Sequence, residues 1–191
     1  TLLSEAGIQN KGTIALPWCA DGILGIELAF WLSGKSPHWA VKKEFLVEEK
    51  LLTALDSKSV EVKAKIVLLD AEFRFVSGSR KNSILAGVVK QVDFSRTPVE
   101  DLDLKFQDET VDTILCIPPQ PSERHDPLPQ WNAFFRRGKQ VMKKGGTLGV
   151  LMMRGAEAFS TLALKNDFKK VKEFTVQQGG ERVVGMVFVK E

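Results

Sequence analysis

Apolar and polar positions follow two alternating patterns along this chain. Short apolar runs are typical of β-strands, and longer segments with apolar residues three and four positions apart are typical of helices that pack on a sheet by one face. Strands are predicted at residues 13–17, 64–70, 89–94, 111–117, 147–153, 169–176 and 182–189. Helices are predicted at residues 22–33, 40–55, 73–86, 131–144 and 156–164, with a proline-rich loop at 120–129.

This order of elements predicts an α/β fold. Strands joined by crossover helices form a parallel sheet that helices cover on both faces, whereas the last two strands, linked through Gly179-Gly180, form an antiparallel hairpin. We therefore expect a doubly wound, mostly parallel seven-stranded sheet with a C-terminal antiparallel hairpin. The length of 191 residues fits a single domain over residues 1–191, and the start at Thr1 suggests a fragment of a larger protein.

The composition is that of an ordinary globular protein, with 43% hydrophobic and 27% charged residues. No apolar run is long enough to span a bilayer, and the first residues do not resemble a signal peptide. Cys19 and Cys116 lie in apolar surroundings, which predicts buried thiols in a reducing, cytoplasmic compartment and no metal site. The formal net charge of +3 permits an RNA partner without requiring one.

The segment Leu16-Pro17-Trp18-Cys19-Ala20-Asp21-Gly22-Ile23 forms a tight turn between a predicted strand and a helix. In α/β proteins a nucleotide-like ligand lies at such a turn, facing the helix N–H groups. The segment resembles the first motif of the class I S-adenosylmethionine-dependent methyltransferases that modify RNA, roughly Asp-Pro-x-Cys-Gly-Ser-Gly-Thr. Pro17, Cys19 and Gly22 match it, and Ala20 replaces its first glycine. The resemblance implies that these four residues bind the cofactor, S-adenosylmethionine.

A second stretch begins with Asp70 and Glu72 at the end of a predicted strand and continues to Arg80, Asn82 and Ala86-Gly87. The same RNA methyltransferases have Asp-x-Asp, Ala-Arg-x-Asn and Ala-Gly at this spacing. A carboxylate at a strand end can accept hydrogen bonds from both ribose hydroxyls of a nucleoside. The resemblance therefore implies that Asp70 or Glu72 holds the ribose of the cofactor. A solvated acid at a strand end is the alternative.

A third stretch, Ile117-Pro118-Pro119-Gln120, ends a further predicted strand. Related enzymes have Asn-Pro-Pro-Tyr there, in which the amide oxygen accepts a hydrogen bond from the target amine and the ring stacks on the extruded base. The resemblance makes Ile117, Pro118, Pro119 and Gln120 the substrate-facing catalytic turn. Ile117 cannot accept a hydrogen bond, however, and Gln120 offers only a poor stacking surface.

Three arginines are candidates for contacts with RNA phosphates. Arg124 lies in the proline-rich loop, where a plain solvated loop is an equally good interpretation, and Arg136 and Arg137 lie in the helix that follows.

Taken together, the three stretches resemble the RNA methyltransferases whose catalytic domain follows a THUMP RNA-binding domain. The resemblance covers nearly the whole chain. It implies transfer of a methyl group from S-adenosylmethionine to a guanine amine of tRNA or rRNA, with a THUMP-type domain outside this chain. Leu16, Pro98 and Ile117 replace polar residues of the family pattern, and Asp21 places a negative charge near the cofactor carboxylate. A second hypothesis is therefore a catalytically inactive methyltransferase-like module that has lost the cofactor and binds RNA or a protein partner.

Overall fold

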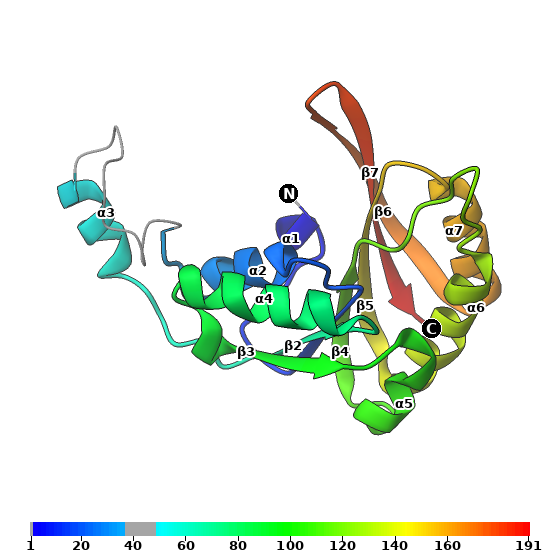
Figure 1. The fold of residues 1–191 in the computed structure, drawn as a ribbon, viewed down its shortest axis with the longest axis horizontal. Coiled ribbons are helices and arrows are strands. Elements are labelled where there is room, and N and C mark those ends of the chain that lie inside the picture. The colour runs from blue at the N-terminus through cyan, green and yellow to red at the C-terminus, as the bar shows by residue number, and fades with distance from the viewer. Residues whose placement is uncertain (1, 37–48) are drawn as a thin grey trace.

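The computed structural model describes residues 2–36 and 49–191 (Figure 1). The helices are α1 Leu2–Glu5, α2 Ile23–Ser33, α3 Glu49–Asp56, α4 Phe73–Leu85, α5 Leu102–Lys105, α6 Leu128–Val141 and α7 Ala156–Lys165. The strands are β1 Thr13–Pro17, β2 Lys65–Asp70, β3 Val92–Arg96, β4 Val111–Cys116, β5 Met142–Met152, β6 Phe168–Gln178 and β7 Glu181–Lys190. No helix within the described ranges is long and apolar enough to cross a membrane.

The seven strands form one sheet in the order β3-β2-β1-β4-β5-β7-β6. Strands β1 to β5 pair in parallel, and β7 pairs antiparallel with both β5 and β6. This confirms the predicted fold class and its C-terminal hairpin. Within the hairpin, β7 lies inside the sheet and β6 forms the edge.

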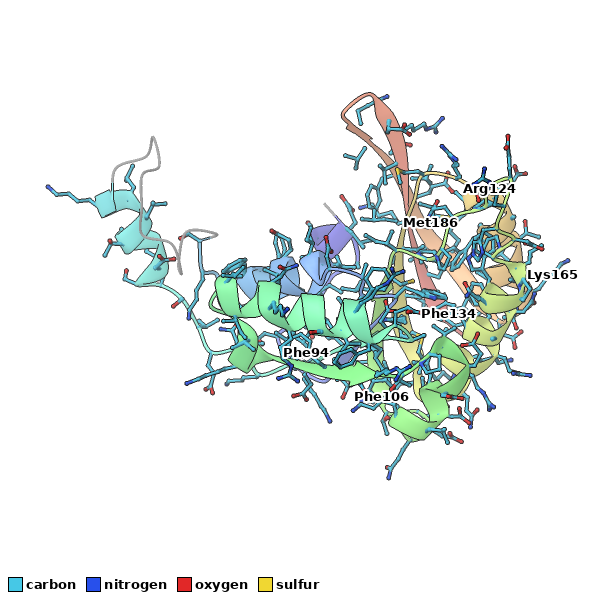
Figure 2. The ribbon with its side chains drawn as sticks, in the orientation of Figure 1. Phe94, Phe106, Arg124, Phe134, Lys165 and Met186 are labelled. Atoms are coloured by element: carbon cyan, nitrogen blue, oxygen red, sulfur yellow. The ribbon has the colours of Figure 1, made fainter. Side chains whose placement is uncertain are left out.

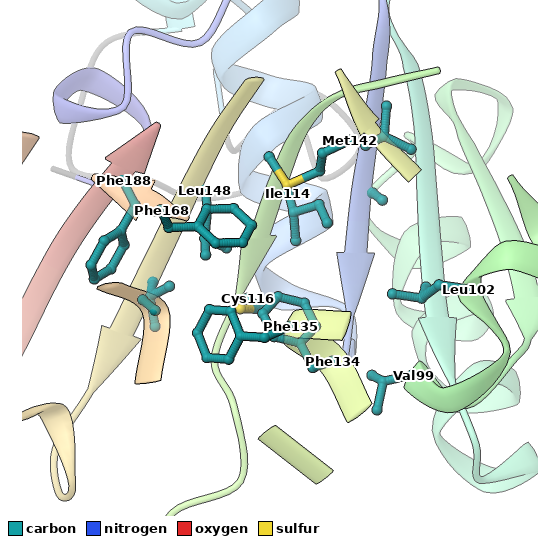
Figure 3. Packing of buried hydrophobic residues seen from close by; sticks show 14 of the residues in the cluster. Val99, Leu102, Ile114, Cys116, Phe134, Phe135, Met142, Leu148, Phe168 and Phe188 are labelled. Atoms are coloured by element: carbon teal, nitrogen blue, oxygen red, sulfur yellow. The ribbon is translucent and has the colours of Figure 1, made fainter. Parts of the chain in front are cut away.

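Two apolar cores form, one on each face of the sheet. On one face the rings of Phe134, Phe135 and Phe159 from α6 and α7 pack with centroids 4.8–6.3 Å apart. Figure 3 shows Phe134 and Phe135 beside Cys116 of β4. On the other face Leu28 of α2 packs among side chains of β1 and β2. The central strands are buried from both sides, which explains their almost continuous apolar sequences.

The helix predicted at residues 131–144 is shifted toward the N-terminus. Helix α6 begins at Leu128, inside the predicted proline-rich loop, because Pro129 lies in the first helical turn, where no N–H is needed. The helix ends at Val141, and Met142 begins β5 instead of lying on the helix.

The edge of the sheet near β3 also differs from the prediction. The segment 89–91 forms a short 3-10 turn, so that the strand predicted at 89–94 runs instead from Val92 to Arg96. Part of the predicted helix 40–55 is present as α3. Residues 37–48, which hold the rest of that prediction, lie outside the described residues.

Candidate functional site

Three loops meet at the carboxyl edge of the sheet. Because β1 lies between β2 and β4, the turn at residues 18–22 is a neighbour of the segment 70–72 and of the turn at 117–120. The carboxyl edge of an open α/β sheet, at the point where the strand order reverses, is where such folds bind ligands. The fold therefore brings the predicted cofactor and substrate segments to one place.

The turn after β1 has a strained backbone. Trp18, Ala20 and Gly22 have positive φ angles of 54°, 46° and 84°, a region that is costly for residues with a Cβ. The N–H of Cys19 donates to the carbonyl of Leu69 at 3.0 Å, which ties this turn to the end of β2. The strain persists because neighbouring elements hold the turn in place.

Helix α4 packs directly on this turn. A Cβ on Gly22 would lie 2.6 Å from the Cβ of Ser79, so the two elements can approach this closely only at a glycine. The side-chain amide of Asn82 donates to the carbonyl of Asp21 at 2.8 Å. The residues Gly22 and Asn82, which match the family pattern, thus hold the turn and α4 together.

Asp70 connects the turns after β1 and β2, and it is only 8% exposed. Its Oδ2 accepts from the N–H of Ala20 at 3.2 Å, and its Oδ1 accepts from the N–H of Glu72 at 3.0 Å. A carboxylate has about four acceptor sites, so each oxygen retains one. Glu72 is exposed and makes no side-chain bond to the start of α4. A buried carboxylate at Asp70 and an exposed acidic residue at Glu72 are therefore both present at the end of β2.

The turn after β4 is held by the side chain of Gln120. Its amide nitrogen donates to the carbonyl of Pro118 at 2.8 Å, and its oxygen accepts from the N–H groups of Met153 and Arg154 at 3.1 and 2.9 Å. The indole N–H of Trp131 donates to the carbonyl of Pro119 at 3.1 Å. These bonds join the Pro-Pro turn to the end of β5 and to α6, and they occupy both ends of the Gln120 amide.

Ile117 precedes this turn and is 47% exposed, so a large apolar side chain lies at the carboxyl edge. Pro118 behind it is buried. Leu16 and Pro98, which also replace polar residues of the family pattern, lie in different surroundings. Leu16 is 1% exposed and belongs to the core, whereas Pro98 precedes the 3-10 turn Val99–Asp101.

The three predicted phosphate-binding arginines lie in different settings. Arg124 is exposed on a small turn closed by paired backbone bonds between Ser122 and His125, and Figure 2 shows it at the periphery of the molecule. Arg136 is exposed on α6. The guanidinium of Arg137 bonds the Asp103 carboxylate at 2.8 Å, so its charge is already paired within the fold.

The thiols of Cys19 and Cys116 are poor nucleophiles. The pKa of Cys19 is raised to about 11, first by burial and in smaller part by the charge of Asp70, while a hydrogen bond with Ser79 acts in the lowering direction. Burial also raises the pKa of Cys116, which is 1% exposed. In the described parts of the chain no group of His, Cys, Asp and Glu side chains is arranged to hold a metal ion. The site contains carboxylates and backbone groups but no activated thiol.

Comparison with known proteins places this site in a family. Residues 1–184 match the family model described as the RMKL-like methyltransferase domain. The chain therefore belongs to that family, which confirms the predicted class of S-adenosylmethionine-dependent methyltransferases. No curated protein sequence matches the chain.

Solved structures with the same fold include three with related descriptions. TrmN from Thermus thermophilus is 19% identical, with a TM-score of 0.68, and the match covers 100% of this chain and 47% of TrmN. SMU.472, a putative methyltransferase complexed with SAH, is 18% identical with a TM-score of 0.78, and the match covers 100% of this chain and 51% of SMU.472. A possible methylase from Clostridium difficile 630 is 17% identical with a TM-score of 0.71, and the match covers 95% of this chain and 49% of the methylase. The chain thus spans about half the length of these proteins.

Proposed function

We propose that this chain is the catalytic domain of an enzyme that methylates RNA, with a guanine amine of tRNA or rRNA as its target. The observation that carries the proposal is the Asp70 carboxylate, which two backbone N–H groups hold at the carboxyl edge with acceptor sites remaining. Family membership supports the class of reaction, and the likeness to TrmN supports an RNA target.

The residues at the carboxyl edge fit the ribose of S-adenosylmethionine. Asp70 and the exposed Glu72 offer acceptors to its two hydroxyls, and the 18–22 turn lies beside them. At the end of β3, hydroxyl groups take the place of a carboxylate for the adenine of the cofactor. Pro98 provides no carboxylate for the adenine amine, but the hydroxyls of Ser95 and Thr97 lie 2.9 Å apart there and can contact it.

S-adenosylmethionine, when bound, supplies an activated methyl group to a nucleophile. The part of this chain is to place the target amine beside it, because most of the rate of such a transfer comes from positioning. The carbonyls of Pro118 and Pro119 each accept one bond from a side chain and keep a second lone pair. Within residues 117–120, we assign these carbonyls to orient the amine, in place of the amide that Ile117 replaces.

The remaining RNA contacts belong to the charged periphery and to a THUMP-type domain outside this chain, in a cytoplasmic enzyme. Arg124 and Arg136 are exposed and available to phosphates. Arg137 contributes mainly to the fold, through its pairing with Asp103.

A second function is favoured by the turn after β4. Gln120 makes its hydrogen bonds within the protein, and Ile117 presents only methyl and methylene groups at the carboxyl edge. A module that keeps the fold but no longer transfers methyl groups, and that binds RNA or a protein, would have this kind of turn.

Titration calorimetry with S-adenosylmethionine and S-adenosylhomocysteine distinguishes the two functions. An enzyme should bind both with micromolar dissociation constants, about 8 kcal/mol. Asp70→Asn should weaken binding by tenfold or more, whereas Asp93→Asn, a matched charge change at an exposed position of β3, should not. Absence of binding by the folded protein would reject the enzyme and leave the non-catalytic module.

Transfer of a labelled methyl group to tRNA and rRNA, followed by nucleoside analysis, then tests the target. Ile117→Asn should raise transfer to the guanine amine by roughly tenfold or more, because it adds a hydrogen-bond acceptor at the transition state. Label on any atom other than a guanine amine would contradict the proposed target but not the proposed reaction.

A further inference from the structure

A helix that packs on a sheet is expected to bury apolar side chains and expose polar ones. Helix α4 does the reverse. Its buried side chains are the small polar Ser79 and Ser83. Its large apolar residues Phe73, Ile84 and Leu85 are 67%, 57% and 72% exposed. Ser79 is buried because α4 approaches the turn after β1 so closely at Gly22. The outer face of the helix, in contrast, leaves apolar side chains in water, which is a feature of interaction surfaces.

The same outer face is positively charged. Arg74, Arg80 and Lys81 are exposed, and the helix contains no acidic residue. None of the three forms an ion pair with any residue of the described ranges 2–36 and 49–191, in contrast to Arg137 of α6. An unpaired set of cations with no interspersed acid complements a polyanion.

Aromatic rings hold both guanidinium groups in place. The guanidinium of Arg74 lies 4.7 Å from the ring centroid of Phe75, and that of Arg80 lies 4.7 Å from the ring centroid of Phe94 on β3. Stacking on a ring uses one face of a guanidinium and leaves its N–H groups free to bind phosphate oxygens. Their orientation before binding lowers the entropy lost when phosphate binds.

The position of α4 connects this face to the candidate site. The helix begins at Phe73, directly after Glu72 and three residues beyond Asp70, the last residue of β2. Figure 1 shows α4 running from the carboxyl edge of the sheet across the front of the molecule, beside α2. An RNA strand that follows α4 would therefore lead to the carboxyl edge.

We propose that the outer face of α4 binds the sugar-phosphate backbone of a single-stranded RNA segment next to the modified nucleotide, with Arg74, Arg80 and Lys81 on phosphates and Phe73 stacked on a base. The inference rests on the proposed RNA-directed function for its choice of polyanion. It adds a binding surface separate from Arg124, Arg136 and Arg137.

The test measures RNA binding by fluorescence anisotropy, without S-adenosylmethionine, using a labelled 20-nucleotide single-stranded RNA and an unmodified tRNA transcript. The variant Arg74→Glu/Arg80→Glu/Lys81→Glu should weaken binding roughly tenfold or more at 100 mM KCl. For the single-stranded probe, loss of three phosphate contacts should reduce the slope of log K against log salt by about 2. Phe73→Ala should weaken binding roughly fivefold and leave the slope unchanged.

The matched control is Lys144→Glu/Lys165→Glu/Lys169→Glu, which makes the same change in net charge at exposed positions on β5, α7 and β6. Figure 2 shows Lys165 at the right-hand edge of the molecule, well away from Phe94. Equal losses in the two triple variants would overturn the inference, as would an unaffected α4 variant or a wild type that binds neither probe. Binding of a protein by this face, with no effect on RNA, would also overturn it.

Because Arg80 covers Phe94, the double variant Arg74→Glu/Lys81→Glu checks that lost binding does not come from lost structure. It should retain the wild-type melting temperature and about two-thirds of the change in salt slope. Calorimetry with S-adenosylmethionine separates this inference from the proposed reaction. A protein that binds no cofactor but loses RNA binding through α4 would reject the reaction and support the surface.

Discussion

The two sides of the carboxyl edge are built in different ways. On the side of β1 and β2, the backbone turn at 18–22 and the Asp70 carboxylate hold each other, and acceptor sites remain beside the exposed Glu72. On the side of β4, the single side chain of Gln120 bonds three backbone groups. The first side keeps carboxylate acceptors for a ligand. On the second side the Gln120 amide is used within the protein, and the carbonyls of Pro118 and Pro119 each keep one lone pair.

This difference shows that the two halves of one site can change independently. Matches to the family pattern at Gly22, Asp70 and Asn82 coincide with contacts that hold the first side together. At Ile117 and Gln120, where the pattern is lost, the turn keeps its shape through bonds to β5 and α6. Loss of a substrate-binding group therefore need not disturb the side that fits the cofactor.

The largest effect is expected from Gly22→Ala, which would disrupt the first side. The new Cβ would lie 2.6 Å from the Cβ of Ser79, at a φ of 84°. Overpacking and backbone strain together should lower the free energy of unfolding by about 3 kcal/mol. Gly78→Ala is the matched control, since a Cβ there meets nothing within 4 Å and should stabilise α4 by about 0.5–1 kcal/mol. Urea denaturation measures both, and equal values would contradict the close packing.

Asp70→Ala should have the next largest effect. It leaves the N–H groups of Ala20 and Glu72 without their acceptor, which should cost about 2 kcal/mol of unfolding free energy and weaken cofactor binding. Asp93→Ala, at an exposed position of the neighbouring strand β3, should change stability by less than about 0.5 kcal/mol. Denaturation curves that coincide for the two variants would show that Asp70 does not join the two turns.

Gln120→Ala tests the second side. Loss of its bonds to Pro118, Met153 and Arg154 should lower the free energy of unfolding by about 1–2 kcal/mol. It should also speed hydrogen exchange at the amides of Met153 and Arg154. Because the first side is built separately, its affinity for S-adenosylmethionine should stay within twofold of the wild type. A large loss of affinity would refute the independence of the two sides.

The smallest effect is expected from Asp112→Asn at the opposite edge of β1 and β4. Burial alone would raise the pKa of Asp112, but bonds from Lys143 at 2.6 Å and from the N–H of Thr13 at 2.8 Å outweigh it, so the pKa is lowered. The stability that these bonds add is present above the ordinary carboxyl pKa of 3.8 and is lost as pH falls through the lowered value. The substitution should cost at most about 1 kcal/mol at pH 7 and nothing in cofactor affinity.

Much of the fold could be predicted because local patterns and global topology agree in this chain. Apolar runs such as residues 66–69 identify strands buried on both faces. The alternating segments 169–176 and 182–189, with Gly179-Gly180 between them, identify the final hairpin. The start of α6 was placed too late because Pro129 was interpreted as part of a loop, although proline is well accepted in a first helical turn.

Site residues could be predicted from the sequence only where their position depends on neighbouring residues in the chain. Asp70 is the last residue of its strand, so its position at the carboxyl edge follows from the sequence. The role of Gln120 does not, since its acceptor oxygen bonds residues 33 and 34 positions away. The exposed face of α4 was missed as well. The sequence predicts a helix at residues 73–86 but not which side is buried, and only the close approach at Gly22 turns its serines inward.

The interior position of β7 has a consequence for how the molecule is made. Since β7 separates β5 from β6, a chain that ends before Glu181 has two strands without a partner between them. During synthesis the β5 edge stays open until residues 181–190 have left the ribosome, and open edges are sites of aggregation. The sheet is therefore closed by one of its last-made segments. Stop codons just upstream of Glu181 should yield insoluble protein even though every residue of the candidate site has been made.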